Sequence, residues 1–308
     1  MKTSECKEEE KRLSDFPINW SDLQTPEEMD INRYFEYDSF AMEMFKRWLP
    51  VLKESSEILE VGSGSGFFTG KLHQLYPKAA ITCLEPDPKL RKTLQAKFKD
   101  FRIIESTLED LESENIFDMS ISHIVIHNLR DALAGIRKMK QAVKKNGFVA
   151  CIEPTQGWRH ILPDDDVRNA LDILWKFNEI ICRKRSEGMG SEERLNPFTY
   201  SYPEFFEELG LRNITCYGWC SIFTLSDNRF DFNERKRWIR RRKDLYLSRK
   251  DEITRILEES GIESETIEGA YSTIFDYFGT LEDADEESLS HIHEQEIVNR
   301  VITIGQKS

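Results

Sequence analysis

One short stretch limits the possible folds of this chain more than any other, the sequence Glu-Ile-Leu-Glu-Val-Gly-Ser-Gly-Ser-Gly at residues 57–66. Its first half contains an apolar run typical of a strand that is buried on both faces. Gly62, Gly64 and Gly66 follow at alternate positions, and glycine lets the backbone turn sharply and lets a ligand approach closely. Apolar residues at helical spacing then predict a helix over Phe67–Leu75. Together these features predict the opening of a βαβ unit of the nucleotide-binding type.

Two carboxylates near the glycine turn indicate which ligand it binds. Glu85 ends a second apolar run, Ala80–Leu84, at the place where a carboxylate accepts hydrogen bonds from ribose hydroxyls. Glu60 precedes the first glycine by two residues, and its charge would repel a pyrophosphate but attract a cation. S-adenosylmethionine carries an ammonium and a sulfonium and no phosphate. We therefore expect this cofactor, and a dehydrogenase is the least favoured enzyme.

Family resemblance supports this expectation. The pattern Glu60-x-Gly62-x-Gly64-x-Gly66 resembles the first motif of class I S-adenosylmethionine-dependent methyltransferases, and the sequence at 84–87 resembles their second. The likeness continues through Phe117–Asp131 and Gly147–Pro154. It implies an α/β fold with a Rossmann-like, doubly wound seven-stranded sheet whose last strand is antiparallel. It also implies S-adenosyl-L-methionine as cofactor and S-adenosyl-L-homocysteine as product.

The resemblance also suggests cofactor contacts beyond the glycines, Glu60 and Glu85. These candidates are Pro86, Thr107, Leu108 and Ser122. Thr107 stands where the family usually has an aspartate that binds the adenine amino group. A threonine hydroxyl makes only a weaker, uncharged hydrogen bond, and Leu108 would contribute a backbone amide at best.

The candidates for catalysis and substrate binding follow the fourth and fifth predicted strands. His123 and His127 are candidate general bases because histidine titrates near neutral pH, with a structural role as the alternative. Glu153, Trp158 and Arg159 are candidates for the substrate side, where Arg159 could hold a carboxylate by a bidentate contact. No metal site is predicted.

The rest of the chain suggests a core with an insertion. We expect a polar tail over residues 1–25, a methyltransferase core over 26–225 and 297–308, and a mostly helical insertion over 226–296. The insertion would cap the substrate pocket or form a dimer. In the core, helices are expected over Pro88–Phe98 and Leu133–Lys145. Tyr34 and Tyr37 would lie near the cofactor or simply pack.

Composition excludes some partners. A net charge of −13 disfavours general nucleic-acid binding, although residues 235–243 contain a dense basic run that is either a solvated helix face or an anionic docking surface. No apolar run is long enough to cross a membrane, and the polar N-terminus is no signal peptide, so we expect a cytoplasmic protein. Cys216 and Cys220 are expected in the core, with a thiol site as the alternative.

The favoured function is methyl transfer to a small molecule by in-line displacement. Two alternatives remain: a protein or peptide methyltransferase, and a regulatory protein that binds S-adenosylmethionine without turnover. The acceptor atom is left open.

Overall fold

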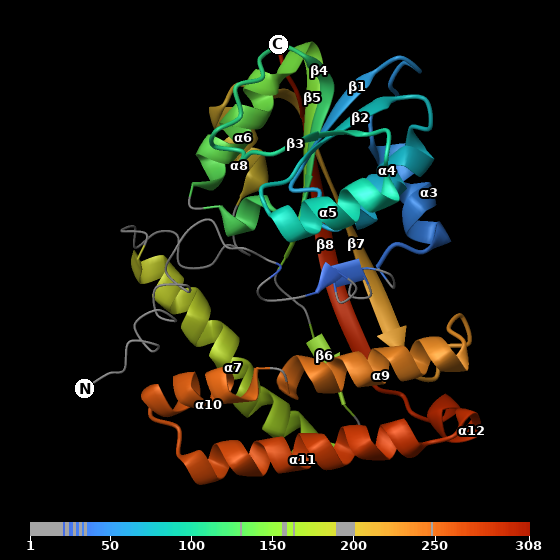
Figure 1. Cartoon of the computed structure of the whole chain (residues 1–308), viewed down its shortest axis with the longest axis vertical. Coiled ribbons are helices and arrows are strands. Elements are labelled where there is room, and N and C mark those ends of the chain that lie inside the picture. The colour runs from blue at the N-terminus through green and yellow to red at the C-terminus, as the bar shows by residue number, and fades with distance from the viewer. Residues whose placement is uncertain are drawn as a thin grey trace. The chain divides into compact units, whose positions relative to one another are not determined.

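The computed structural model describes residues 21, 25–26, 29–30, 33, 36–129, 131–155, 159–162, 164–188, 201–247 and 249–308. The chain divides into two compact units. Unit 1 contains residues 1–156, 197–220 and 299–308, and unit 2 contains 157–196 and 221–298. Figure 1 labels the elements of both units.

A mixed sheet forms the centre of unit 1. Its strand order in the described residues is β3-β2-β1-β4-β5-β8, and β7 also pairs with β8. Neighbours from β3 to β5 are parallel, whereas β8 runs antiparallel to β5. The predicted doubly wound sheet with an antiparallel last strand is confirmed. The strands are β1 Glu57–Val61, β2 Ala80–Leu84, β3 Arg102–Ile104, β4 Phe117–His123, β5 Val143–Pro154, β7 Arg212–Thr224 and β8 Gln295–Gln306.

Helices cover both faces of this sheet (Figure 1). On one face, Ile136 of α6 and Phe206 of α8 pack in a core with Leu59 of β1. On the other, Phe45 of α3 and Leu72 of α4 pack with neighbouring strand residues. Because β1 is buried on both faces, its continuous apolar run is explained. The helices are α3 Ser39–Trp48, α4 Phe67–Leu75, α5 Pro88–Lys97, α6 Ala132–Ala142 and α8 Tyr202–Glu208, with a 3-10 turn, η2, at Ile126–Asn128.

The helix expected over Leu133–Lys145 is shorter than predicted. It ends at Ala142, and β5 begins at the next residue. Asn146 has a φ of 64°, and a Cβ on Gly147 would lie 2.9 Å from the carbonyl oxygen of Lys144. These two residues therefore bend the first part of β5, which helical periodicity alone does not reveal.

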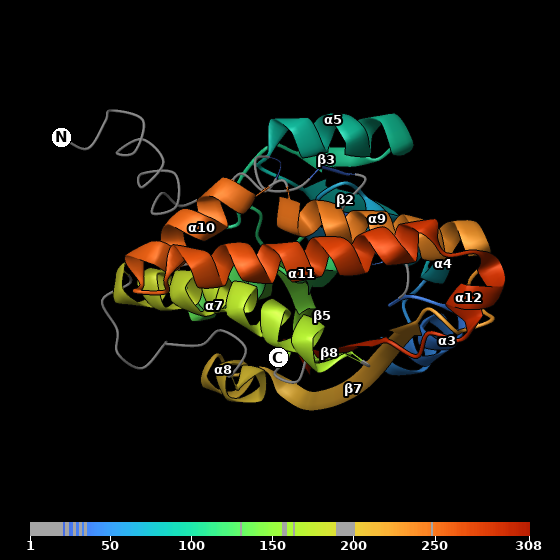
Figure 2. The ribbon, with the colours of Figure 1, turned by 90° about the horizontal axis from the view of Figure 1, so that it is seen from below.

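Unit 2 is mostly helical. In Figure 1 and Figure 2, α7 and α11 lie side by side, in agreement with their extensive contacts. The guanidinium of Arg249 lies 4.6 Å from the ring centre of Phe177 on α7. The elements of this unit are β6 Arg159–Ile161, α7 Asp165–Gly188, α9 Phe232–Leu247, α10 Lys250–Glu259, α11 Ser264–Asp283 and α12 Glu286–Ser290.

This division differs from the expected insertion over 226–296. The second unit also includes residues 157–196, because α7 packs against α10 and α11. The sequence placed α7 in the core because it follows the fifth strand directly. Helix–helix contact between segments far apart in the sequence, not order along the chain, decides the grouping.

The basic run of residues 235–243 is partly buried in unit 2, since Arg235, Lys236 and Arg242 are buried whereas Arg237 and Arg240 are exposed. Lys236 is buried, and its Nζ donates to the carbonyl oxygens of Leu281 (3.1 Å), Glu282 (2.6 Å) and Ala284. It thereby satisfies carbonyl groups at the C-terminal end of α11. Arg242 is also buried and forms an ion pair with Glu296. Neither of these cations is available to an anionic partner at the surface.

Two further sequence expectations concern surface and membrane. Cys216 and Cys220 are exposed free cysteines on β7, so the expectation that they lie in the core is wrong. Both fall on the same face of a strand whose outward side chains reach solvent. Within the described ranges, no helix is long and apolar enough to cross a membrane.

Candidate functional site

The strand register brings the predicted site residues to one edge of the sheet. Val61 is paired with Leu84 on one side and Ser122 on the other, so Gly62, Glu85 and His123 each follow directly. His123 is paired with Ile152, after which comes Glu153. This is the carboxyl edge of the parallel strands, where open α/β sheets bind ligands.

The glycine turn has the conformation that its residues predict. Gly62, Gly64 and Gly66 have φ values of 66°, 56° and 89°. A Cβ on Gly62 would lie 2.5 Å from Cγ2 of Val125, and one on Gly66 would lie 2.8 Å from Cδ1 of Leu94. Both the left-handed backbone and the space around it therefore require glycine.

Glu60 is a buried carboxylate without a cation. It is 1% exposed, and its Oε2 accepts a hydrogen bond of 2.6 Å from Oγ1 of Thr69. Burial raises the pKa of Glu60 to about 7, although the hydrogen bond from Thr69 opposes this shift. No lysine or arginine in the described part of the chain forms an ion pair with it. A cation bound beside it would favour its ionised form.

Glu85 connects the second strand to the glycine turn. Its Oε2 accepts a 2.7 Å hydrogen bond from the amide of Gly64, and its Oε1 accepts one of 2.9 Å from Asp87. Burial raises the pKa of Glu85. Pro86 is exposed beside it. A carboxylate has about four acceptor positions, so ribose hydroxyls can also bind to this group.

Thr107 is engaged within its own loop. Its Oγ1 donates to Oδ2 of Asp110 over 2.8 Å and accepts from the amide of Asp110 over 3.3 Å. Leu108 is buried in the core beneath α6. The adenine contact of these two residues stays a prediction, and the hydroxyl of Thr107 already has partners.

His123 lies in an aromatic environment. Its ring stacks on Phe68 at 4.6 Å, and its Nε2 is hydrogen-bonded to the hydroxyl of Tyr37. Burial, then the charges of Arg33 and Arg300, hold the pKa of His123 well below its usual value. Because burial also keeps the hydroxyl of Tyr37 protonated by raising its pKa, that hydroxyl donates to Nε2. This geometry favours the structural alternative for His123, whose role as a base stays a prediction.

His127 is arranged differently. Its Nδ1 lies 2.6 Å from Oε2 of Glu153, which is 1% exposed. A carboxylate on one ring nitrogen fixes the tautomer and orients the ring for proton transfer at the other. Of the two histidines, His127 has the geometry of a general base.

Glu153 also organises the turn after β4. Its Oε1 accepts hydrogen bonds from the amides of Val125 (3.2 Å) and Ile126 (2.9 Å) at the start of η2. It is therefore bound to its own chain, and a direct contact with substrate stays a prediction. Ser122 is fully buried one residue before the end of β4, where it is paired with Cys151.

Sequence reasoning missed a strained residue in the same turn. Ile124 has a φ of 58°, a conformation that β-branched residues rarely adopt. Its amide donates to the carbonyl of Ile152 over 2.8 Å, and its carbonyl accepts from Nδ2 of Asn128 over 3.2 Å. Such strain is frequent at functional sites. An isoleucine gives no sequence signal for it.

Residues before the first strand also reach the glycine turn. The methyl carbon of Met29 lies 3.5 Å from the place of a Cβ on Gly64, and Asp30 accepts a hydrogen bond from Oγ of Ser65. Sequence reasoning had chosen Tyr34 and Tyr37 from this segment. Tyr37 lies against His123, whereas Tyr34 is outside the described residues.

Two substrate candidates cannot be placed by their side chains. Trp158 lies outside the described residues, and Arg159 is described only as backbone, in β6. Arg159 belongs to unit 2, where β6 pairs with β8.

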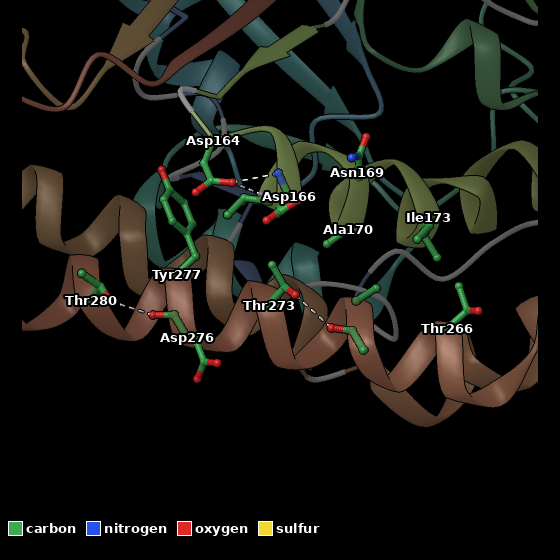
Figure 3. A pocket seen from close by; sticks show the side chains of 13 residues that line it. Asp164, Asp166, Asn169, Ala170, Ile173, Thr266, Thr273, Asp276, Tyr277 and Thr280 are labelled. Carbon is green, nitrogen blue, oxygen red and sulfur yellow. Dashed lines mark hydrogen bonds between the residues drawn. The ribbon is translucent and has the colours of Figure 1, made fainter.

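A separate groove of about 660 Å³ lies in unit 2 between α7 and α11 (Figure 3). Asp164 and Asp166 contribute from the start of α7, and Thr273, Asp276 and Tyr277 from α11. None of the predicted site residues lines this groove. Asp164 is engaged in accepting hydrogen bonds from amides of the first turn of α7. The groove and the carboxyl edge of the sheet are therefore formed by different residues.

Fold and site therefore define an open α/β ligand-binding protein, and comparison with known proteins identifies its class. Residues 59–151 match the family model of a methyltransferase domain. An uncharacterized methyltransferase of Schizosaccharomyces pombe is 26% identical over 117 residues, which is 34% of this chain and 42% of the relative. The malonyl-[acyl-carrier protein] O-methyltransferase of Anoxybacillus flavithermus is 26% identical over 132 residues, 41% of this chain and 51% of the relative.

A solved structure agrees in fold. A candidate methyltransferase from an antibiotic biosynthesis pathway of Anabaena variabilis aligns with a TM-score of 0.50 and 15% identity, over 87% of this chain and 97% of that one. The chain spans only about half, or less, of the length of the curated relatives it matches.

Residues 59–151 thus match a methyltransferase domain, as the resemblance to class I S-adenosylmethionine-dependent methyltransferases implied. The resemblance, the fold and the cofactor predicted from the sequence are confirmed. The residues present fit that cofactor, because Glu60 is a buried carboxylate that no described lysine or arginine pairs with, and the glycines leave the backbone of the turn open to close approach.

Proposed function

We propose that the protein transfers the methyl group of S-adenosyl-L-methionine to a small-molecule acceptor. The observation that carries this proposal is the buried carboxylate of Glu60 beside a turn of three glycines with left-handed backbone, two of which leave no space for a Cβ. Bound S-adenosylmethionine supplies a methyl group on a sulfonium, which passes in line to a nucleophile. The protein's main contribution is to orient the reactants and exclude water.

The residues of this chain have distinct proposed roles. Glu60 holds positive charge at the start of the turn, and Glu85 accepts hydrogen bonds from ribose hydroxyls. His127, oriented by Glu153, removes a proton when the acceptor is a hydroxyl or an ammonium. His123 keeps the wall of the site in place through Tyr37 and Phe68.

The small size of the acceptor is supported by chain connectivity. The polypeptide leaves the sheet after the carboxyl end of β5 and passes directly into unit 2. The overall charge of −13 supports an acceptor other than nucleic acid.

A carrier-bound acceptor is the second candidate. Two of the curated relatives are named as O-methyltransferases of malonyl-[acyl-carrier protein]. This candidate belongs with the protein-methyltransferase alternative, since it requires a docking surface for a carrier. A regulatory protein without turnover is the third. Cytoplasmic location is proposed because Cys216 and Cys220 are free and exposed, which suits a reducing compartment. A homodimer stays a prediction.

Binding and turnover separate these possibilities. Calorimetric titration of the full chain with S-adenosylhomocysteine should give saturable binding, and titration with NAD should give none. Incubation with labelled S-adenosylmethionine and a cell extract below 1 kDa cut-off, about the limit for metabolites, should then yield a labelled small product. Label found only in proteins would support the second candidate, and cofactor binding without any labelled product would support the regulator. Failure to bind S-adenosylhomocysteine would refute the proposed function.

A further inference from the structure

Strand β7 is the end strand of the sheet in unit 1 over residues 212–220. β5 pairs with β8 over residues 300–306, so β7 lies on the other edge of β8. Cys216 is beside Thr303 of β8, with 3.4 Å between Sγ and Oγ1. Within the described residues no other strand pairs with β7, which Figure 2 shows on the outside of β8. Its outer edge therefore leaves the backbone N–H and C=O groups of alternate residues available for another strand.

This edge lacks the features that usually keep edge strands from pairing. Natural edge strands are commonly protected by lysine, proline, a bulge or an inward-pointing charge. Residues 213–220 contain no charged residue and no proline. The strand is 13 residues long, and Thr215, Cys216 and Gly218 are among its exposed residues. A long, uncharged and exposed edge of this kind is a template for a further strand.

Gly218, in the middle of this edge, is not required by its own chain. Glycine in a strand interior weakens the strand, and it often marks a bulge, a bend or the close approach of another backbone. Gly218 is not among the glycines with positive φ. A Cβ added to it would lie 3.5 Å from the carbonyl oxygen of Arg300, which is an ordinary contact distance. A backbone that approaches from outside the chain explains this glycine best.

The residues on either side of Gly218 form a palindrome of side-chain types. The sequence at 216–220 is Cys-Tyr-Gly-Trp-Cys, so each cysteine and each aromatic residue has its like at the same distance from the centre. Cys216 and Cys220 are exposed. Tyr217 and Trp219 alternate with them and pack toward α3, where they contact the rings of Trp48 and Phe45. A two-fold interface requires such self-complementarity, because the same residues meet from both copies.

We propose that the β7 edge pairs antiparallel with the β7 edge of a second copy of this chain, about a two-fold axis at Gly218. The two glycines meet at the axis, where neither brings a side chain. Cys216 of each copy then lies opposite Cys220 of the other, and Tyr217 lies opposite Trp219. These aromatic residues form cross-strand pairs that stabilise the contact. The sheet of unit 1 continues from one copy into the other, whichever acceptor the enzyme uses.

Sedimentation velocity of the full chain tests the dimer. Under reducing conditions, a series of protein concentrations should show a reversible monomer–dimer equilibrium. Gly218→Lys places two like charges at the axis and should raise the Kd of the dimer by at least about tenfold. Gly269→Lys is the matched control, because Gly269 is an exposed glycine of α11 where a Cβ would meet nothing within 4 Å. It should leave the Kd within about twofold.

Disulfide cross-linking with diamide tests the register. Opposite residues of antiparallel strands have Cα atoms about 4.5–5.5 Å apart, within the range of a disulfide. Each Cys216–Cys220 disulfide between copies forms as two thiols lose two protons and two electrons to the N=N bond of diamide, which becomes a hydrazine. Within one strand the same two residues are about 13 Å apart, too far for a disulfide. The wild type should therefore give a covalent dimer that dithiothreitol reverses.

Two serine variants make the register test specific. Cys216→Ser alone and Cys220→Ser alone should each lose the cross-link, because a serine then faces every remaining cysteine of the pair. An equimolar mixture of the two variants should restore it, since a mixed dimer keeps one Cys216 opposite one Cys220. The mixture also decides the matter if Gly218→Lys fails to fold.

Several results would overturn the β7 dimer. The chain could remain monomeric at every concentration and give no covalent dimer with diamide. A folded Gly218→Lys could dimerise as strongly as the wild type, or Gly269→Lys could be the variant that loses the dimer, which would place the contact on α11. Cross-links that persist in both single serine variants would show that other cysteines meet.

Discussion

At the scale of single residues, burial gives Glu60 a pH dependence that an exposed glutamate lacks. Its pKa rises from 4.5 to about 7 because the ionised form loses water in the folded protein. Between these values the folded chain binds a proton that the unfolded chain releases. The free energy of unfolding should therefore fall by about 3 kcal/mol as pH rises from 4.5 to 7.

Glu60→Gln tests this expectation because glutamine does not titrate. Urea unfolding at pH 5 and pH 8 should show that the variant lacks this part of the pH dependence. Glu109→Gln, at an exposed position, should retain it. A wild-type slope in Glu60→Gln would contradict the assignment. Binding of S-adenosylhomocysteine should strengthen by about tenfold from pH 6 to pH 8 in the wild type only, since the ionised carboxylate attracts the ligand's ammonium.

Glu153 links two structures that the sequence did not connect. Its carboxylate accepts from the amides of η2 and from His127. In Glu153→Gln, the side-chain NH2 group would face one or more of the N–H groups that donate to the Glu153 carboxylate. We expect a loss of about 1–3 kcal/mol in the free energy of unfolding, measured by urea titration.

Activity gives Glu153→Gln a second readout. If His127 is the base, the variant should lower kcat by more than it raises KM. Glu207→Gln on α8 provides a control outside the site. An unfolding free energy equal to that of the wild type would show that Glu153 does not hold the turn.

At the scale of elements, the glycine turn offers a matched pair of substitutions. Gly62 and Gly64 both have positive φ, but only a Cβ on Gly62 would collide, at 2.5 Å from Val125. Both alanine variants carry the backbone strain of about 1–2 kcal/mol. Gly62→Ala should lose about 1–3 kcal/mol more, because a β-branched side chain in a packed site cannot easily move away.

Chemical denaturation measures the difference in unfolding free energy between the two variants, which is the cost of the collision with Val125. Adding Val125→Ala to Gly62→Ala should recover part of the extra loss, since it removes the two γ-carbons that the new methyl meets. The same addition to Gly64→Ala should bring no recovery. Equal stability of the two single variants would show that the turn relaxes freely.

The elements themselves were largely predictable from local pattern. Phe67–Leu75 and Ala80–Leu84 have the predicted bounds, because the helix and the strand each have a clear apolar period and a defined end. Helix α6 was extended too far, because Val143 fits a helical period but is paired with Phe117 in the sheet. Long-range pairing, which has no local signal, decided that boundary.

At the scale of the whole molecule, the residues predicted to bind the cofactor all belong to unit 1. Adding S-adenosylhomocysteine should therefore slow hydrogen exchange more in unit 1 than in unit 2. Protection should increase in residues 62–66 and 85–87, by up to about 2.7 kcal/mol at a ligand concentration 100 times Kd. Helices α9 and α11 of unit 2 should change by less than about 0.5 kcal/mol.

Mass spectrometry of peptic fragments provides this measurement. Helix α8 gives an internal reference in unit 1, because its outward residues Glu204 and Glu207 face solvent and are far from the turn in sequence. Protection confined to unit 2 would place the cofactor elsewhere and contradict the assignment of the glycine turn.

The sequence by itself determined the sheet type, the glycine turn and the cofactor class, since these depend on short patterns that act within one βαβ unit. Only the tertiary structure decided which groups surround them. The hydrogen bonds from the amides of η2 to Glu153 and the packing of α7 against α11 join residues far apart in the chain. Burial, charge pairing and packing depend on those distant neighbours, and spacing along the sequence does not encode them. Gly62 to Gly66 could be read directly because a backbone conformation is a local property.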